Sequence, residues 1–496
     1  MNFVGISCGF HDAGVSVVND KGDILFAGHS ERYSKKKHDA NLCEGILDDA
    51  MHHVYYNGNK FELHYYEKPW LKAIRQFRAG QPIGPLSVKQ IIGPELVDRI
   101  GDPAIFTHVH HKTHAAAGFQ TSPFTDATVV IIDAIGEMDC VSIWDARYDK
   151  NGVAKYKKLW SKKYPDSIGM YYSAMTKRVG LHPMDEEYIL MGMAAYGTPK
   201  LFNKIEKELL EDTTNLVFRH NLHTGVNDDF LGSDADHMDI AHSSQVLVEH
   251  LIEIVMSKAR MLGKSTNLVY GGGVALNCLA NRLLGKYFDK IWIMPNPGDA
   301  GNSLGAAALG YGKKVYWNNA FLGHEIQGSY PVVDVYRELK KNKMVGVASG
   351  RAEFGPRALG NRSLLADPRG PEIKDKVNEI KRRQKFRPFA PIILEEHVHE
   401  YFDMPRGWTD SRYMQVIADC RHPDLYPAIA HHDNTSRVQT VAKDGSGIRK
   451  LLELWYKETG CPMLLNTSLN IRGEPMVNDR SDADRFEKLY NLKVVS

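Results

Sequence analysis

The sequence predicts an α/β protein with at least two domains. Segments of alternating or continuous apolar residues, typical of strands, alternate along the chain with segments whose apolar residues recur every three or four positions, typical of helices. This alternation favours mixed sheets covered by helices. The chain has 496 residues, which is long for a single hydrophobic core.

Two similar strand–turn–strand segments lie in the first part of the chain. Residues 15–28 (VSVVNDKGDILFAG) predict a β-hairpin with its turn at Asn19 to Asp23. Residues 127–160 predict an apolar strand that ends at Asp133, a glycine-bearing turn, and two further strands joined at DKNG. Each segment places a glycine-containing loop next to an aspartate, which indicates a weak internal repeat.

Helical patterns follow both segments. CEGILDDAMHHVYY and SQVLVEHLIEIVMSKARMLG carry apolar residues at helical spacing, and Gly263 is a plausible C-cap of the second helix. NLVYGGGVALNCLANRLL and IWIMPNPGDAGNSLGAAALGYG each predict a strand, a glycine loop and a helix. Near residues 318–330 the sequence becomes polar and turn-rich, and a new helix–strand pattern begins. We therefore expect two domains, residues 1–325 and 326–496.

Composition excludes several classes of protein. The formal net charge is +2, so any anion site must come from local clustering of cations. No stretch approaches the roughly eighteen apolar residues of a membrane span, and the first residues indicate a strand, a turn and a strand rather than a signal peptide. The six cysteines are scattered without a CxxC pair, which argues against a disulfide framework or a zinc knuckle. We expect a cytoplasmic protein without membrane partners.

The segment HVHHKTHAAAGF is a candidate metal-binding motif. His110 and His114 are four residues apart and would lie on one face of a helix, whereas His111 would point elsewhere. Asp133 at a strand end and Asp299 in a glycine-rich loop could complete the site. Two histidines with two aspartates suit Fe²⁺, Mn²⁺ or Zn²⁺ better than Ca²⁺. The alternatives are an exposed histidine cluster that caps a helix and aspartates that serve in a turn or as helix N-caps.

The glycine triplet in YGGGVALN, which runs from Tyr270 to Asn277, is a second candidate site. Three glycines between an apolar strand and a helix let a ligand approach backbone N–H groups. The alternative is close packing of the helix against the strand.

The last third of the chain collects positive charge among glycines, in GRAEFGPRALGNRSLLADPR and in KRRQKFRPFAP. Guanidinium groups bind phosphate bidentately. Pro388, Phe389 and Pro391 would press Arg387 against apolar surface, where a cation needs an anionic partner. We therefore favour a pocket for ATP or a phosphorylated small molecule over a solvated basic face or an RNA surface. The candidate residues are Arg351, Arg357, Arg362, Arg369, Lys381, Arg382, Arg383, Lys385, Arg387 and Arg437, with Asn466, Thr467, Ser468 and Asn470 in LLNTSLN.

Taken together, these motifs resemble the O-carbamoyltransferases of the NodU/CmcH/TobZ family. The resemblance covers nearly the whole chain and rests on GFHDAGVSVV, HHKTHAAAGF, MGMAAYGTPK, GGGVALN, PNPGDAGNSLGAA, GRAEFGPRALGNRSLLADPR, FRPFAPIIL, DNTSRVQTV and TGCPMLLNTSLN. Single motifs such as the glycine triplet are not specific, but the ordered set is.

The resemblance implies a two-site enzyme. The N-terminal domain would have a duplicated actin/Hsp70-like (ASKHA) fold, and the C-terminal domain a YrdC-like α/β fold. The C-terminal site would make carbamoyladenylate from carbamoyl phosphate and ATP, with Mg²⁺ accompanying the ATP. The N-terminal site would transfer the carbamoyl group to an acceptor hydroxyl and release AMP, with a bound metal ion that is usually iron.

The resemblance also assigns roles to residues. His110, His114, Asp133 and Asp299 match the metal positions. His11 is the best candidate for the base that accepts the hydroxyl proton, and Asp12 could orient it; a histidine in a turn is the alternative for His11. A lysine from Lys35 to Lys37, represented by Lys36, would lie near the acceptor or the carbamoyl group. Nucleotide contacts of the N-terminal site are expected at Gly169, Gly192, Gly272, Gly273 and Asn277. Carbamoyl phosphate and ATP would bind Arg351, Arg357, Arg362, Lys381, Arg383, Arg387, Arg437, Asn466, Ser468 and Asn470.

Some positions depart from the family pattern. Ala134 follows Asp133 where the family usually has glycine, Ile189 replaces a lysine, and Gln384 replaces a glutamate. None of these changes removes a proposed metal ligand. The changes themselves lead us to expect a divergent acceptor pocket.

Two other functions are compatible with an actin-like fold: a tRNA threonylcarbamoyl transferase-like enzyme and a non-catalytic nucleotide-binding protein. The arginine-rich C-terminal half argues against the first, and the retained histidine pair and the NTSLN loop argue against the second. The acceptor could be a sugar, a natural product or a hydroxymethyl group, including one on a nucleotide. A homodimer is the default expectation for a soluble assembly.

Overall fold

The structure is a computed structural model that describes residues 1–56, 60–101, 103–384, 387 and 389–496. By their internal contacts these residues form two compact units. Unit 1 consists of Met1–Ser30 and His38–Asn318, and unit 2 of Glu31–Lys37 and Asn319–Ser496. The short segment Glu31–Lys37 therefore packs with the C-terminal part of the chain. Its run of charged residues does not indicate this packing, so domain limits drawn from the sequence place it in the first domain.

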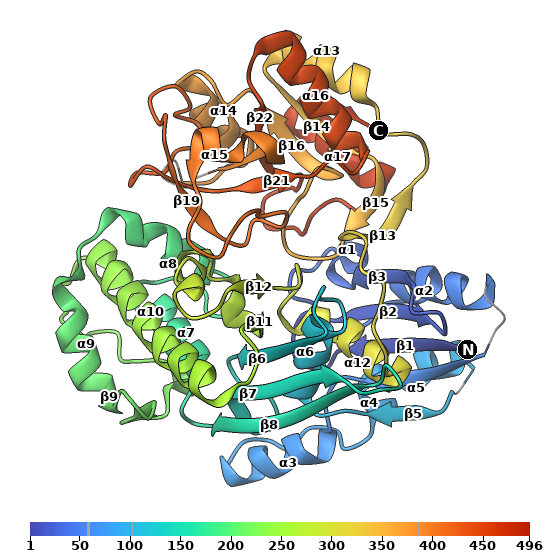
Figure 1. Cartoon of the computed structure of the whole chain (residues 1–496), viewed down its shortest axis with the longest axis vertical. Coiled ribbons are helices and arrows are strands. Elements are labelled where there is room, and N and C mark those ends of the chain that lie inside the picture. Colours follow the sequence, from blue (N-terminus) through green and yellow to red (C-terminus); the bar gives the residue numbers. More distant parts are fainter. Residues whose placement is uncertain (57–59, 102, 385–386, 388) are drawn as a thin grey trace. The chain divides into compact units, whose positions relative to one another are not determined.

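Unit 1 contains two five-stranded sheets with the same topology (Figure 1). In each sheet three consecutive strands pair antiparallel, a fourth strand pairs in parallel with the first of these, and a fifth pairs in parallel with the fourth. The first sheet has the order β3 (Ile24–His29), β2 (Gly14–Asn19), β1 (Asn2–Ser7), β4 (Phe61–Tyr65), β5 (Ile105–Thr107). The second has the order β12 (Lys290–Trp292), β11 (Asn267–Gly271), β6 (Asp126–Ile132), β7 (Asp139–Tyr148), β8 (Ala154–Lys163).

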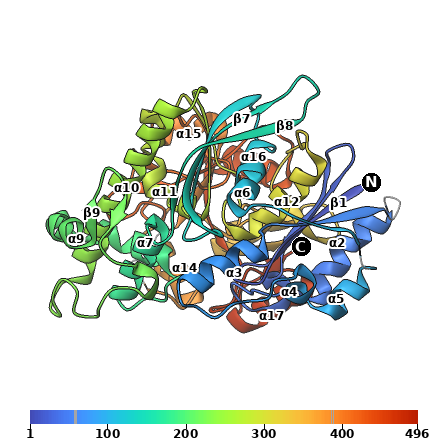
Figure 2. The ribbon, with the colours of Figure 1, turned by 90° about the horizontal axis from the view of Figure 1, so that it is seen from below.

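Two helices occupy equivalent places in the two halves of unit 1. Helix α6 (His110–Phe119) follows β5, and helix α12 (Asn302–Tyr311) follows β12. Helix α12 packs on β1, β2 and β4, α6 packs on β6 and β11, and the two helices contact each other (Figure 2). Each half therefore covers the sheet of the other half with its last helix. The predicted duplicated actin-like fold is confirmed by this repeated topology.

Close approach at the centre of unit 1 depends on glycine. A Cβ atom at Gly305 of α12 would lie 2.0 Å from the Thr113 carbonyl oxygen of α6, and one at Gly5 of β1 would lie 1.8 Å from the Ser303 carbonyl oxygen. Only a residue without a side chain fits at such contacts. The glycines thus set the distance between the elements that carry the histidines of α6 and the loop before α12.

The other predicted elements of unit 1 are present with some changes. The hairpin of β2 and β3 and the helix α2 (Glu44–Tyr56) lie where the patterns place them. Helix α10 (His237–Leu262) begins earlier than its apolar pattern, because Asp236 caps its first turn by accepting from the N–H groups of Met238 and Asp239. Gly263 is its C-cap, in an extended rather than a left-handed conformation. The helix predicted after the glycine triplet is only η4 (Gly273–Leu276) and α11 (Cys278–Asn281).

The remaining elements of unit 1 are short. They are α3 (Pro69–Arg78), α4 (Val88–Ile92), α5 (Pro94–Arg99), α7 (Ile168–Arg178), α8 (Glu187–Met193), η1 (Ala194–Tyr196), η2 (Pro199–Leu201), α9 (Phe202–Leu209), β9 (Leu210–Asp212), β10 (Val217–Phe218), η3 (Leu222–Thr224), η5 (Leu284–Lys286) and η6 (Asp299–Gly301).

Unit 2 is built on a six-stranded mixed sheet with helices, which confirms the predicted C-terminal α/β domain; its likeness to YrdC proteins stays a prediction. The order is β21 (Gln439–Val441), β17 (Ala390–Leu394), β22 (Met463–Ser468), β16 (Arg362–Ala366), β14 (Met344–Ala348), β23 (Val494–Val495). Helices α13 (Val332–Asn342) and α16 (Gly447–Thr459) pack on each other, and Trp455 of α16 is buried in the core. The other elements are α1 (Glu31–Ser34), β13 (Phe321–Ile326), β15 (Gly350–Glu353), α14 (Glu372–Ile380), η7 (Glu395–His397), α15 (Val398–Tyr401), β18 (Phe402–Asp403), β19 (Ile417–Cys420), β20 (Thr435–Arg437) and α17 (Arg480–Tyr490).

Within the described residues, none of the helices combines the length and the apolar character that crossing a bilayer requires.

The contact between α6 and α12 predicts a strong effect of one added methyl group. Gly305→Ala forces its Cβ against the Thr113 carbonyl and should cost about 2 kcal/mol, which lowers the midpoint of thermal unfolding by about 5 °C. Gly298→Ala is the matched control, because nothing lies within 4 Å of a Cβ at that position. Equal midpoints for the two variants would show that the helices are not in close contact.

Candidate functional site

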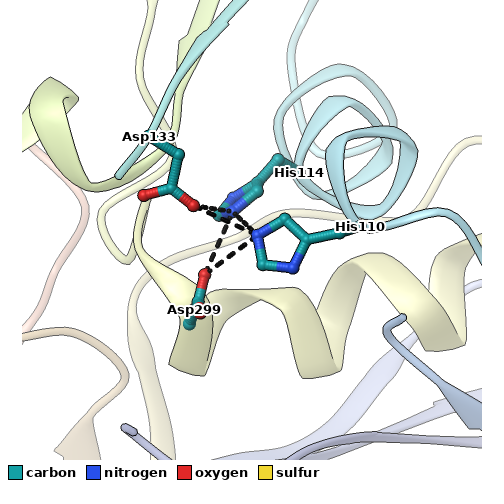
Figure 3. A group of neighbouring side chains, drawn as sticks. All are labelled: His110, His114, Asp133 and Asp299. Atoms are coloured by element: carbon teal, nitrogen blue, oxygen red, sulfur yellow. Dashed lines mark hydrogen bonds and ion pairs between the residues drawn. The ribbon is translucent and has the colours of Figure 1, made fainter. Parts of the chain in front are cut away.

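Four side chains that are far apart in sequence converge at the centre of unit 1. His110 and His114 lie one turn apart at the start of α6, Asp133 follows β6, and Asp299 begins η6, immediately before α12 (Figure 3). Each of the four residues is at most 8% exposed. This burial excludes the alternative of an exposed histidine cluster.

One atom from each side chain points at a common centre. The Nε2 atoms of His110 and His114 are 3.1 Å apart. Asp133 Oδ2 lies 3.1 Å from Nε2 of His110 and 3.3 Å from Nε2 of His114. Asp299 Oδ1 lies 3.3 Å and 3.2 Å from the same two atoms. We call these four residues the His/Asp cluster.

These distances fit a shared transition-metal ion. Ligands about 2.0–2.2 Å from a cation are about 3.0–3.5 Å from one another in tetrahedral or octahedral arrangements. Two imidazole nitrogens and two carboxylate oxygens form a donor set suited to Fe²⁺, Mn²⁺ or Zn²⁺. The donor chemistry and the spacing of the His/Asp cluster therefore match the metal that the sequence predicts, without distinguishing among these ions.

The electrostatics of the cluster follow from the two carboxylates. Burial lowers the pKa of His110, but the charges of Asp299 and Asp133 outweigh burial and raise it well above its usual value. Burial would raise the pKa of Asp133, but hydrogen bonds with His110 and His114 hold it well below its usual range. Both carboxylates are therefore ionised and able to serve as ligands.

Neighbouring groups hold the cluster in place. The Gly273 N–H donates to Asp133 Oδ1 at 3.1 Å, and Asn302 Nδ2 lies 2.9 Å from His114 Nε2. Glu137, which is buried, accepts the His110 backbone N–H at 3.0 Å and thereby caps the start of α6. His111 turns away, and its Nδ1 lies 2.7 Å from Ser142 Oγ.

His11 lies beside the cluster, in the loop between β1 and β2. Its Nε2 is 3.7 Å from Asp299 Oδ2, and its Nδ1 is 2.8 Å from Asp12 Oδ2. Burial lowers the pKa of His11, but the hydrogen bond with Asp12 and the charge of Asp299 outweigh burial and raise it to about 8. Asp12 thus orients the ring so that Nε2 faces the cluster.

Three of the glycines expected to contact nucleotide, Gly169, Gly272 and Gly273, lie around the end of β6. A Cβ atom at Gly169 would come within 2.8 Å of the Ala134 backbone, and one at Gly272 within 2.2 Å of the Ile132 carbonyl oxygen. Gly192 lies in α8, and no atom lies within 4 Å of a Cβ placed there. Asn277 caps α11 and exchanges two hydrogen bonds with Gln245. At Gly272 the glycine is therefore required by close packing against β6, which was the alternative explanation for the triplet.

Lys36, the predicted catalytic lysine, belongs to unit 2, whereas His11 belongs to unit 1. It is exposed and belongs to Glu31–Lys37, the segment that packs with unit 2. In this segment Lys35 pairs with Asp482, and Arg32 donates to the Gly355 carbonyl oxygen at 2.9 Å.

Unit 2 contains a buried cationic site at the end of β22. Lys381 Nζ donates to the Ser468 carbonyl oxygen at 2.6 Å and to Asn470 Oδ1. Burial lowers the pKa of Lys381 well below its usual value, and the positive charges of Arg383, Arg387 and Lys37 lower it further. Cations gathered in this way are stabilised by a bound anion. Lys385 and Pro388, which the sequence placed in this region, lie outside the described residues.

The other predicted anion ligands of unit 2 divide into two groups. Arg362 is fully buried and donates to the carbonyl oxygens of Ser349, Asn361, His324, Gly350 and Asn478, which uses every N–H of its guanidinium group. Arg362 therefore holds the surrounding backbone in place and has no N–H group left to bind an anion. Arg351 likewise donates to the Gly323 and Leu322 carbonyls of β13.

Arg357, Asn466 and Arg437 are three further candidates. Arg357 is half-buried. Asn466 donates to the Ala358 carbonyl oxygen at 3.0 Å and to Gln439 Oε1 at 2.8 Å. Among the described residues, no hydrogen-bond partner is found for the buried Nε of Arg437.

Sequence reasoning missed Asn302, Glu137 and the contacts of Asp12 with His38. Asn302 lies three residues after Asp299 at the start of a helix, a spacing that could have indicated it. Glu137 and His38 are linked to their partners only by tertiary structure, so spacing along the chain carries no signal for them.

Comparison with known proteins places the chain in a family. Residues 57–308 match the family model described as carbamoyltransferase N-terminus, and residues 336–495 match the one described as carbamoyltransferase C-terminus. The uncharacterized protein sll1178 of Synechocystis sp. is 32% identical, over 98% of this chain and 94% of its own length. Nodulation protein NolO of Bradyrhizobium diazoefficiens is 33% identical over 75% of each chain. Nodulation protein U of Sinorhizobium fredii is 30% identical, over 77% of this chain and 75% of its own length.

Solved structures align with this chain at low identity. The activator of 2-hydroxyisocaproyl-CoA dehydratase from Clostridium difficile, with bound ADPNP, is 14% identical with a TM-score of 0.35 and covers 63% of this chain and 94% of its own. HypF of T. kodakarensis is 15% identical with a TM-score of 0.33 and covers 62% of this chain and 47% of its own.

The two family models match both parts of the chain that the fold separates, and the relatives align along most of it. A non-catalytic nucleotide-binding protein, the alternative left open by the sequence, is therefore set aside. The chain belongs to the carbamoyltransferase family and is an enzyme that transfers carbamoyl groups.

Proposed function

We propose that the chain is an ATP-dependent O-carbamoyltransferase that works in two steps, one in each unit. Unit 2 makes carbamoyladenylate, and unit 1 transfers the carbamoyl group to an acceptor hydroxyl. The observation that carries the proposal is the His/Asp cluster with His11 beside it, because this arrangement combines a metal-binding donor set with a base.

In unit 2, the cations around Lys381 bind the two anionic substrates. Carbamoyl phosphate gives up its phosphate to water, and an oxygen of the resulting carbamate attacks the α-phosphorus of ATP, from which pyrophosphate leaves. The reactants repel each other, so fixed positive charges lower the barrier to their approach. Arg383, Arg387 and Lys37, whose charges all act on Lys381, supply these charges. Ser468 and Asn470 hold the lysine in position. Mg²⁺ accompanies the ATP.

In unit 1, carbamoyladenylate is the substrate. His110, His114, Asp133 and Asp299 would hold a transition metal, most simply Fe²⁺, which when bound supplies Lewis acidity to the carbamoyl carbonyl. His11 takes the proton of the acceptor hydroxyl at Nε2 as the hydroxyl oxygen attacks the carbamoyl carbon. AMP leaves with the electron pair of the broken C–O bond. The loop with Gly272, Gly273 and Asn277 lies beside Asp133 and suits the nucleotide, because glycines let a ligand approach the backbone closely.

The acceptor belongs to the class of hydroxylated small molecules. A sugar, a natural product or a hydroxymethylated nucleotide provides the required O–H group, and Ala134 and Ile189 are positions at which this chain departs from the family pattern. A panel of such acceptors with labelled carbamoyl phosphate identifies the substrate.

Two variants separate the steps. Arg387→Ala should abolish the pyrophosphate released from ATP and carbamoyl phosphate without acceptor, because it removes one of the charges that neutralise the substrates. His114→Ala should leave this release within about 3-fold of wild type and lower carbamoyl transfer at least about 100-fold, because it removes a metal ligand. The reverse pattern, with pyrophosphate release lost in His114→Ala and retained in Arg387→Ala, would contradict the assignment of steps to units.

The His/Asp cluster predicts which residues control metal content. The chain purified without chelators should contain about one transition-metal ion, measured by elemental mass spectrometry. His110→Ala and Asp299→Asn should each lose most of it, whereas His111→Gln should retain it, because His111 contacts Ser142 instead. A metal-free wild-type chain, or equal loss in folded His111→Gln, would rule out the cluster as the binding site.

A further inference from the structure

A second histidine contacts the carboxylate that orients His11. His38 Nδ1 lies 2.7 Å from Asp12 Oδ1, while His11 Nδ1 lies 2.8 Å from Asp12 Oδ2. The other nitrogen of His38, Nε2, lies 3.0 Å from Asp185 Oδ1. Four side chains from three distant segments of unit 1 thus form one continuous series that ends beside the His/Asp cluster.

The series is held together by its carboxylates. An ionised carboxylate only accepts hydrogen bonds. Both ring nitrogens of His38 face carboxylate oxygens, one of Asp12 and one of Asp185. Asp12 therefore lies between two imidazole rings. Burial would raise the pKa of Asp12, but the hydrogen bonds from His11 and His38 hold it below its usual range.

Asp12 and His38 both have an unusual backbone conformation. Asp12 has φ 52° and His38 has φ 53°, a left-handed conformation that is uncommon for residues other than glycine. The two loops are joined by backbone hydrogen bonds from Gly9 N–H to the Ala40 carbonyl and from Ala13 N–H to the Asp39 carbonyl, both 2.7 Å. Such conformations persist where surrounding contacts fix them, and they occur often at active sites.

We propose that His38 is a positioning residue for carbamoyl transfer. It fixes the Asp12 carboxylate, which in turn holds the His11 ring with Nε2 toward the His/Asp cluster, and Asp185 orients His38. This inference rests on the proposed role of His11 as the base. His38 also follows directly after Glu31–Lys37, the segment that packs with unit 2, so the residue that holds the base lies where the chain returns to unit 1.

The test compares two replacements of His38, by Asn and by Asp, whose side chains have the same shape as each other. Asn and Asp both tolerate the left-handed conformation at position 38, so backbone strain is matched. In His38→Asn the amide N–H can still donate to Asp12, whereas in His38→Asp a carboxylate faces Asp12 and repels it. The readouts are pyrophosphate release without acceptor, metal content, and kcat and KM for transfer. The acceptor probe is whichever of D-glucose and 5-hydroxymethyldeoxycytidine monophosphate the wild-type chain carbamoylates faster.

We expect His38→Asn to keep kcat for transfer within about 5-fold of wild type and His38→Asp to lower it about 100-fold, the size of effect that misplacing a general base produces. KM, pyrophosphate release and metal content should be unchanged in both. Asp185→Asn should behave like His38→Asn, because its amide oxygen still accepts from His38.

The failure of this inference differs from a failure of the proposed function. Equal transfer by His38→Asn and His38→Asp, with an active wild-type chain, overturns the positioning role alone. Equal loss in both, with a lowered unfolding midpoint, assigns His38 to loop stability and also overturns it. A wild-type chain that releases no pyrophosphate and transfers nothing to either probe overturns the proposed function, and the role of His38 with it.

Discussion

The structure of unit 1 depends on the convergence of two imidazoles and two carboxylates in a buried space. The two Nε2 atoms lie 3.1 Å from each other and 3.1–3.3 Å from one oxygen of each carboxylate, and all four residues are buried. Buried carboxylates and histidines at these distances need compensation by protons or by a cation. Hydrogen bonds also fix the chain around these groups: the Gly273 N–H donates to Asp133, the Asn302 amide nitrogen contacts His114, and Glu137 accepts the His110 backbone N–H.

The duplicated topology explains how such a cluster arises. The two helices that follow the last strand of each half, α6 and α12, begin at the cluster, so His110 and Asp299 come from equivalent places. The turn after the first strand of each half also meets there: Asp133 follows β6, and the loop with His11 follows β1. A repeated fold thus brings the His/Asp cluster and His11 together from two pairs of equivalent positions, while the sequences of the two halves differ.

Much of this could be predicted from the sequence because the signals are local. The histidine spacing on one helix, the aspartate at the end of an apolar strand and the repeated strand–turn–strand pattern each lie within a short window, and the structure has them as expected. The helix predicted after the glycine triplet is present only as short helical segments, η4 and α11, with Asn277 as the N-cap of α11. Arg362 is of a residue type that often binds anions. In the structure it is buried, and its N–H groups donate to backbone carbonyls instead. Two features depend on tertiary packing and leave no local pattern in the sequence. They are the packing of Glu31–Lys37 with unit 2 and the contact of His38 with Asp12.

We propose that the His/Asp cluster holds the cation that carbamoyl transfer requires. Anomalous X-ray diffraction from crystals of the chain, collected on either side of the iron absorption edge and then at the manganese and zinc edges, is the direct test. We expect one strong anomalous peak bounded by the Nε2 atoms of His110 and His114 and by the carboxylates of Asp133 and Asp299. A featureless map at that position in crystals of active enzyme would contradict it.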